Sequence, residues 1–391
     1  MRSLGLLFSL FTALLCLAPF QVSAESTPLV IGVDADLSAV AVEGGVAITR
    51  GVELAAEEIN ASGGILGRPV RVVVKDHRGN PARGIHHLNQ LAENENLLAV
   101  VGGVHTPVLL EEIETIHKKD ILMLVPWAAG TPIIDNGMSP NNVFRISVRD
   151  AEAAKVLLKH AAEKNLRSVA LVLERTGWGR SNLESLQKSA KEIGIEIKGV
   201  HWINWQQKHF SEDINAIKDA AVDGIILVTN VPEAAVVLEE MNNHMLLDLP
   251  IISHWGIASG QLTERLTTPI DQYDIAVLQT FHFNHQKNDR AKHLYERYVS
   301  QYGLVEPNAI EGVTGLAHAY DLVHLIATAA DKAGSIEIDA LRRALESLET
   351  FEGAVKTYAP PFTKDRHDAL WSKDYFMTTF NKKGQLVTSG Q

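Results

Sequence analysis

Residues 49–84 read TRGVELAAEEINASGGILGRPVRVVVKDHRGNPARG, and this stretch decides the fold. Its first part repeats apolar residues at about 3.6-residue spacing, which predicts an amphipathic helix that ends at Gly63–Gly64. The β-branched run Val70–Val74 predicts a strand, and Asn80–Pro81 predicts the start of a second helix, where the missing N–H of proline costs little. The stretch is therefore an α-β-α unit, and a further strand, Leu29–Val33, precedes it.

The alternation of strands and helices continues well beyond this unit. Leu97–Val101 and Ile121–Val125 are wholly apolar, which is typical of parallel strands covered on both faces, and Thr106–Lys118 between them predicts a crossover helix. This pattern predicts an α/β fold with two doubly wound parallel-sheet lobes. Later helices are expected over residues 151–164, 178–193, 212–221, 232–245, 287–302, 309–333 and 337–348, and later strands over 168–173, 196–201, 224–228, 250–253 and 275–279.

The first 24 residues predict a secretory signal peptide. Arg2 supplies the charged start, Leu4–Phe20 the apolar core and Val22–Ala24 the small-residue cleavage site. A retained membrane anchor is the alternative. Cys16 suggests lipidation, but Leu15 stands before it where a small residue is expected, so export to a periplasm is favoured over lipid anchoring. Because Cys16 is the only cysteine, the mature chain forms no internal disulfide.

Composition excludes several classes of function. The formal net charge of −11 disfavours binding to nucleic acid or to an anionic membrane. The close histidines, His86–His87 and His282 with His285, lack a cysteine or carboxylate at metal-ligand spacing, and GxSxG, P-loop and HExxH motifs are absent from the sequence. The sequence therefore predicts no metal, no cofactor, no membrane insertion after signal cleavage and no enzymatic activity.

The segment Glu58–Pro69 reads EINASGGILGRP and closely resembles the EINAxGGILGR motif of the periplasmic Leu/Ile/Val-binding protein family. Tyr320–Asp321 lies in a second segment that is similar to the AYDAV helix of the same family. Members of this family are solute receptors of ABC importers. Similar segments recur along nearly the whole mature chain.

This resemblance implies two lobes joined by a three-crossing hinge. It places residues 25–147 and 281–355 in the first lobe, and residues 148–280 and 356–391 in the second. The chain would cross between the lobes near residues 145–150, 278–283 and 354–358. Ligands of such sheets bind beyond the carboxyl ends of the strands, so the loops after the strands are the candidate site.

In the first lobe, the resemblance assigns a ligand-binding hydroxyl to Thr106, at the start of the helix after the third strand. A hydroxyl and free N–H groups at a helix N-terminus suit an anion, although Thr106 could also be only a helix cap. The next matching segment contains Trp127, Ala128 and Ala129. Ala129 stands where the family usually has a threonine hydroxyl, and the bulky Trp127 precedes it.

In the second lobe, Trp178 matches an aromatic residue that closes over the ligand, and Asn230 lies in the next loop after a strand. The larger departure is Trp255, which replaces the carboxylate that pairs with the ammonium group of an amino acid. Asp34, Asp36 or Glu43 could supply that partner instead, or could be solvated or capping residues. Three tryptophans suit a flat or apolar ligand, so we expect an aromatic or apolar organic acid rather than leucine, isoleucine or valine.

The resemblance thus implies a monomeric periplasmic receptor that captures a small molecule by hinge closure and delivers it to an ABC transporter permease. Two alternatives stay open at this point. A protein that presents its ligand to a membrane sensor would have the same sequence features. An enzyme in the same cleft would need a positioned nucleophile or an acid–base pair, and the sequence contains no motif for either.

Overall fold

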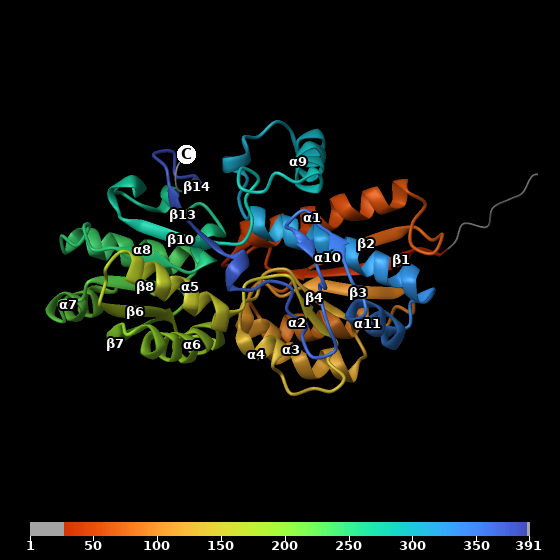
Figure 1. The fold of residues 1–391 in the computed structure, drawn as a ribbon, viewed down its shortest axis with the longest axis horizontal. Coiled ribbons are helices and arrows are strands. Elements are labelled where there is room, and N and C mark those ends of the chain that lie inside the picture. The colour runs from red at the N-terminus through yellow and green to blue at the C-terminus, as the bar shows by residue number, and fades with distance from the viewer. Residues whose placement is uncertain (1–26, 389–391) are drawn as a thin grey trace, which may run out of the picture.

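The computed structural model describes residues 27–388, so the predicted signal peptide lies outside the described residues. Two separate sheets lie side by side along the longest axis of the molecule (Figure 1). The first sheet is wholly parallel, with the order β2-β1-β3-β4-β5. Its strands are β1 (Leu29–Ala35), β2 (Val70–Asp76), β3 (Leu97–Gly102), β4 (Met123–Val125) and β5 (Val143–Arg145).

The second sheet has the order β14-β13-β10-β9-β8-β6-β7, and its strands are parallel except β13, which is antiparallel to both β10 and β14. This arrangement confirms the predicted α/β class with parallel-sheet lobes. The strands are β6 (Ser168–Glu174), β7 (Glu196–Ile203), β8 (Gly224–Val228), β9 (Ile251–Ser253), β10 (Ile275–Gln279), β13 (Phe376–Phe380) and β14 (Leu386–Thr388). A small hairpin of β11 (Phe351–Glu352) and β12 (Thr357–Tyr358) stands apart from both sheets.

Helices cover the sheets and bury their apolar faces. Those that follow strands β1 to β4 are α1 (Val42–Ala61), α2 (Pro81–Leu91), α3 (Thr106–Lys118) and α4 (Thr131–Ile134). Those of the second sheet are α5 (Asp150–Glu163), α6 (Gly177–Ile193), α7 (Ser211–Asp219) and α8 (Val231–Asn243). Three later helices follow β10, namely α9 (Asp289–Tyr302), α10 (Val313–Ala333) and α11 (Ile338–Glu346).

Helix α10 returns to the first sheet and packs along α1 (Figure 1). A Cβ atom on Gly51 of α1 would lie 2.2 Å from the carbonyl oxygen of Leu316, so glycine permits this close approach. Polar contacts join the same elements, since Tyr320 donates a hydrogen bond to Glu58 at 2.6 Å. We therefore call β1–β5 with α1–α4 and α9–α11 the first lobe, and β6–β10, β13 and β14 with α5–α8 the second lobe.

Two helix boundaries differ from the sequence prediction. The sequence predicts the first amphipathic helix within the stretch that starts at residue 49, but α1 begins at Val42. Gly45 in its first turns is needed because a Cβ atom there would lie 2.0 Å from the carbonyl oxygen of Asp36. Helix α10 begins at Val313 rather than at residue 309, since Gly312 has a left-handed backbone with φ of 60°.

Residues 367–369 lie beside β5 of the first sheet. The N–H of Arg145 donates to the carbonyl of His367 at 2.8 Å, and the N–H of Ala369 donates to the carbonyl of Arg145 at 3.0 Å. The boundary expected at residue 355 assigned this segment to the second lobe. In the structure this segment pairs with β5, and the chain then contacts α5 at Ser372 before it reaches β13.

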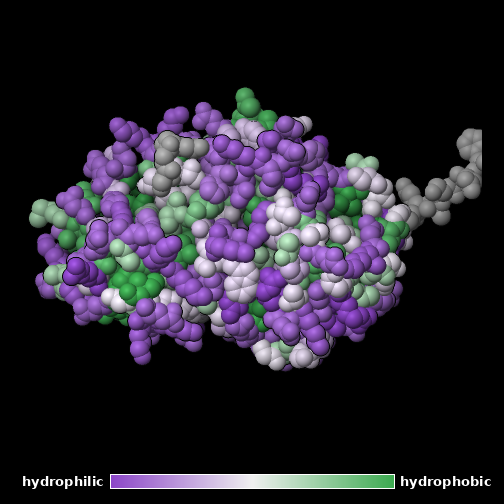
Figure 2. Space-filling model, in the orientation of Figure 1, coloured by the Kyte–Doolittle hydropathy of each residue, from purple (hydrophilic) through white to green (hydrophobic). Residues whose placement is uncertain are grey.

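The surface is mainly polar. Figure 2 shows a face on which hydrophilic residues predominate and hydrophobic residues form small separate groups. Among residues 27–388, none of the helices combines the length and the apolar character that crossing a bilayer requires.

Candidate functional site

Loops at the carboxyl ends of the strands in both sheets meet between the two lobes. They surround a cavity of about 10 Å³, which is close to the smallest space that holds one water molecule. The lobes are in direct contact here, since the N–H of Thr131 donates to the hydroxyl of Ser181 at 3.0 Å. The lining residues are Val104, His105, Thr106, Pro107, Trp127, Ala129, Glu174, Trp178, Trp205, Asn230 and Trp255.

Two indole rings fill the centre of this site. Trp127 of the first lobe stacks on Trp255 of the second, with ring centroids 4.9 Å apart and an angle of 26° between the planes. Both side chains are buried, and His318 from α10 lies against Trp255 at 6.0 Å. The space that remains beside the two indoles is too small for a solute larger than about one water molecule.

Trp178 forms a wall of the site at the start of α6. Its indole N–H donates to the buried carboxylate of Asp150 at 3.2 Å, and its ring meets the edge of His254 at 5.1 Å. The side-chain N–H is therefore already used, and the ring face is what Trp178 offers to a neighbour. Thr106 at the start of α3 accepts a hydrogen bond from the N–H of Gly130 at 3.1 Å, which fixes the turn after β4.

A carboxylate lies at the end of β6 in the second lobe. Glu174 accepts hydrogen bonds from the backbone N–H and the side-chain amide of Asn230, at 2.6 and 2.7 Å, and from the indole N–H of Trp205 at 2.7 Å. Burial raises the pKa of Glu174 to about 8, and the carboxylate of Glu233 adds to the shift. Glu174 is therefore largely protonated at neutral pH.

A second buried acidic group belongs to the first lobe. Asp36 accepts from the backbone N–H groups of Val40 and Ala41 and pairs with His105, whose Nε2 lies 2.7 Å from Oδ2. Burial would raise the pKa of Asp36, but the hydrogen bonds from His105 and the backbone hold it well below its usual range. The ring of Trp205 meets His105 edge-on at 5.2 Å, so this pair touches the second lobe.

We call Trp127, Trp178, Trp205, Trp255, His105 and Glu174 the cleft cluster. The structure brings together six residues that the sequence analysis proposed, namely Thr106, Trp127, Ala129, Trp178, Asn230 and Trp255. The sequence analysis did not propose His105, Glu174 or Trp205. A signal existed for Glu174, since a carboxylate at the carboxyl end of a wholly buried strand is unusual, but Trp205 lies in a loop without a motif.

The other proposed residues lie elsewhere. Ala128 belongs to the core around α3 and is not in the cavity wall. Glu43 lies in the first turn of α1, beside Gly260 of the second lobe, and its carboxylate is not in the wall either. Asp34 pairs with His87 at 2.9 Å, and Asp36 is occupied by His105, so neither carboxylate lines the cavity.

Two larger cavities flank the site between the lobes. One has a volume of about 260 Å³ and is lined in part by Gln279 and Glu311. The other has a volume of about 740 Å³ and is lined in part by Arg149, Lys188 and Arg366. The cleft tryptophans line neither space, so the aromatic site is separate from both. Within residues 27–388, no group of three or more histidine, cysteine or acidic residues is placed to hold a metal ion.

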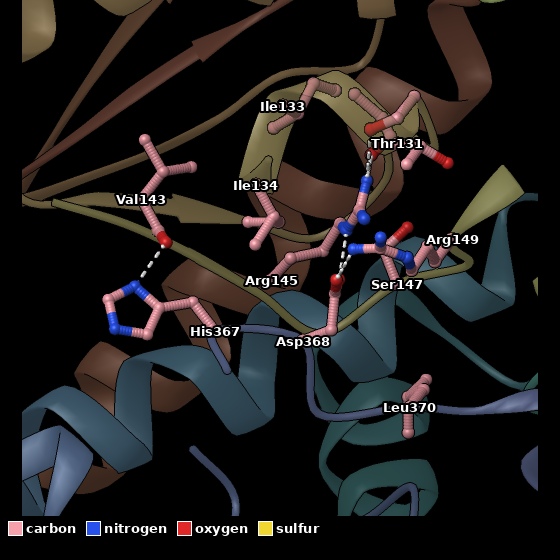
Figure 3. A network of polar contacts seen from close by, with 12 residues as sticks. Thr131, Ile133, Ile134, Val143, Arg145, Ser147, Arg149, His367, Asp368 and Leu370 are labelled. Atoms are coloured by element: carbon pink, nitrogen blue, oxygen red, sulfur yellow. Dashed lines mark hydrogen bonds and ion pairs between the residues drawn. The ribbon is translucent and has the colours of Figure 1, made fainter. Parts of the chain in front are cut away.

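A charged network lies behind the cleft, where the chain leaves β5 (Figure 3). Arg145 is fully buried and donates to Asp368 at 2.6 Å and to the carbonyl oxygens of Ala128 and Gly130 at 3.2 and 2.8 Å. Arg149 donates to the other oxygen of Asp368 at 2.9 Å. This hinge network, Arg145, Arg149 and Asp368, holds the turn that carries Trp127 and Ala129.

Residues 28–385 match the family model described as periplasmic binding protein. Leu/Ile/Val-binding protein homolog 3 from Brucella melitensis is 28% identical over 203 residues, which are 51% of this chain and 54% of that protein. The chain thus spans about half the length of that relative. Homolog 1 from the same organism is 24% identical over 312 residues, which are 79% of each chain.

Solved structures share the fold. A type 1 periplasmic binding protein from Bordetella pertussis has a TM-score of 0.84 at 21% identity and covers 93% of this chain and 100% of its own. A branched-chain amino acid transporter substrate-binding protein from Streptococcus pneumoniae, in complex with isoleucine, has a TM-score of 0.79 at 22% identity. It covers 92% of this chain and 99% of its own. A solute-binding protein of an ABC transporter from Rhodopseudomonas palustris, in complex with 3,4-dihydroxybenzoic acid, has a TM-score of 0.77 at 16% identity. It covers 92% of this chain and 95% of its own.

Proposed function

This chain belongs to the periplasmic binding protein family, as a type I member of the branched-chain amino acid group, and from that premise we propose that it captures one small molecule between its lobes and delivers it to an ABC importer. The observation that carries the proposal is the cleft cluster, in which tryptophans of both lobes meet in one small space. A solute between them would contact both lobes at once.

We propose hinge closure as the capture mechanism. A ligand stabilises a closed state only if it gains contacts there that the open state lacks. The proposed lobes are residues 25–147 with 281–355 and residues 148–280 with 356–391, with the last crossing moved beyond residue 369 because that segment pairs with β5. Export to the periplasm after removal of residues 1–24, action as a monomer and transfer to a permease are parts of the same proposal.

The ligand that we propose is an aromatic or apolar organic acid rather than leucine, isoleucine or valine. The rings of Trp127 and Trp255 are stacked, and separating them would create a narrow space between their faces that fits an aromatic ring. Trp255 stands where related amino-acid receptors have an ammonium partner, and the carboxylates of Asp34, Asp36 and Glu43 lie outside the cavity wall. Burying an unpaired ammonium group in such a site would weaken binding by roughly several kcal/mol.

We propose that the site binds its ligand without chemical conversion. The hydroxyl of Thr106 is hydrogen-bonded to Gly130, and His105 is paired with Asp36. Neither is arranged as a nucleophile beside its base, which the enzymatic alternative requires.

Dye-monitored melting of the mature protein against a broad panel of solutes tests this function. We expect aromatic and apolar acids to raise the melting temperature more than branched-chain amino acids, because binding to the folded state alone stabilises it. Small-angle scattering with a stabilising solute then tests closure, and a protein that starts open should become more compact. Stabilisation by leucine at micromolar concentration would overturn the ligand class, and a panel without any stabilising solute would overturn the receptor function.

A further inference from the structure

We infer that Glu174 binds a hydroxyl group on the ligand, so that the receptor selects hydroxylated aromatic acids over the same acids without the hydroxyl. This inference rests on the proposed function, because it specifies the ligand of the same site. It starts from a residue that the resemblance did not assign. Glu174 is 1% exposed and is part of the cavity wall between the tryptophans of both lobes.

The hydrogen bonds of Glu174 leave one position open. A carboxyl group has about four positions for hydrogen-bond partners. Asn230 occupies two positions at Oε1, and the indole N–H of Trp205 occupies one at Oε2. Among residues 27–388, no further donor reaches Oε2. The remaining position belongs to an oxygen of the cavity wall, which is where a ligand group can reach it.

The side chain is held rigidly for this purpose. Glu174 is the last residue of β6, which lies between β8 and β7 in the second sheet, and Asn230 just before α8 binds it through two N–H groups. Trp205 from the loop after β7 fixes the other oxygen from the opposite side. A buried polar group with fixed neighbours discriminates strongly, because a ligand that lacks the matching group leaves it unpaired.

The electrostatic surroundings favour a hydroxyl over a charged group. Glu233 at the start of α8 and Asp36 of the first lobe are the nearby acidic groups, and His105 at the start of α3 and Lys208 are the nearby basic ones. A second carboxylate so close to Glu174 disfavours its ionised form, and burial raises its pKa to about 8. A hydroxyl suits a carboxyl group in either state, since it both donates and accepts hydrogen bonds.

The geometry therefore describes a ligand with two polar ends and a flat middle. The ring would lie between Trp127 and Trp255 after the indoles separate. Its acid end would face the first lobe at Thr106, whose helix N-terminus suits an anion. The hydroxyl would face Glu174 on the second lobe, so the contact would form across the cleft on closure.

Isothermal titration calorimetry with the mature protein tests the inference with benzoate, 4-hydroxybenzoate and 3,4-dihydroxybenzoate as probes. We expect at least one hydroxylated acid to bind about tenfold or more tightly than benzoate, as sites built for a hydroxyl do. In Glu174→Ala this ratio should fall close to one, whereas Glu174→Gln should keep part of it, because an amide still offers hydrogen-bond positions. Glu196→Ala is the matched control, since Glu196 is exposed at the far end of β7.

Melting curves of each variant without ligand establish that it is folded. Equal binding of benzoate and the hydroxylated acids by the wild-type protein would overturn the inference while leaving the receptor function intact. So would an unchanged ratio in a folded Glu174→Ala variant. Preference for 4-aminomethylbenzoate over 4-hydroxybenzoate would also overturn it, because the open position would then serve a cation. Absence of binding by all of these acids would overturn the inference as well. Failure of the receptor function is a different outcome, in which no solute of the broad panel stabilises the protein.

Discussion

The cleft cluster and the hinge network are both largely buried, but the first consists mainly of aromatic rings and the second of charged side chains. The cleft cluster consists mainly of indole rings, and its contacts run from one lobe to the other, as between Trp127 and Trp255. In the hinge network, Arg145 binds Asp368 and two carbonyl groups of the same lobe. The proposed opening of the lobes would therefore break the cleft contacts and preserve those of Arg145. The cleft contacts depend on how the two lobes are placed, whereas those of Arg145 do not.

The largest effect on stability is expected for Arg145→Ala, which tests the hinge network. The substitution leaves Asp368 paired only with Arg149 and removes the donor to the carbonyl oxygens of Ala128 and Gly130, so we expect the free energy of unfolding to fall by about 3 kcal/mol or more. Denaturant titration measures this change. Arg297→Ala, which removes a surface ion pair with Glu57, should cost less than about 1 kcal/mol. Similar losses in the two variants would show that the hinge network is not a special source of stability.

Trp255→Ala tests the cleft cluster. If the ring anchors the ligand, we expect the affinity for the best aromatic acid to fall by about 2 kcal/mol or more, which is roughly a thirtyfold rise in Kd. Titration calorimetry measures it, and a melting curve establishes that the variant is folded. Trp371→Ala removes a tryptophan outside the cleft cavity and should leave the Kd unchanged. A larger effect at Trp371 would contradict the assignment.

The pH dependence of stability sharpens the comparison. Burial raises the pKa of Glu174 from 4.5 to about 8, so the folded protein keeps a proton that the unfolded chain releases. The stability from this group is complete below pH 4.5 and is lost as pH rises toward 8. Glu174→Gln cannot ionise, and its stability should fall less between these values, by about 1 kcal/mol or more. Parallel pH profiles of the two proteins in urea would rule out this linkage.

The smallest effect is expected at Glu43, which stands outside the cavity wall. Glu43→Gln should change the Kd for an aromatic acid less than about twofold, because its carboxylate does not reach the ligand, and surface changes are usually near neutral. A large loss of affinity would show that the cleft rearranges on binding, so that α1 joins the site.

Much of the fold could be predicted from sequence because buried parallel strands leave a plain signal. The helix Thr106–Lys118 has the predicted bounds, and the apolar run Gly224–Val228 forms the predicted strand. The start of α1 could not be predicted in this way. The sequence analysis recognised this helix only within the stretch from residue 49 on, and the need for Gly45 arises from contact with the carbonyl of Asp36 in the folded chain.

The site was predictable where residues directly follow strands. Trp178 and Trp255 stand at such positions, and the structure places both in the cavity wall. Trp205 stands only two residues after β7, the edge strand of the second lobe, but the sequence analysis ended that strand at residue 201 and did not treat the loop after it as part of the site. Ala128 packs into the core around α3, whereas its neighbours Trp127 and Ala129 line the cavity, and the sequence pattern does not distinguish these positions.

The pair β13–β14 covers the edge of the second sheet beside β10, and α10 covers α1 in the first lobe. Both covers come from the C-terminal part of the chain, so a polypeptide emerging from the ribosome carries two unfinished lobes for most of its synthesis. An uncovered sheet edge and an exposed helix face cannot yet complete their cores. Completion of both cores therefore depends on segments that the chain supplies last.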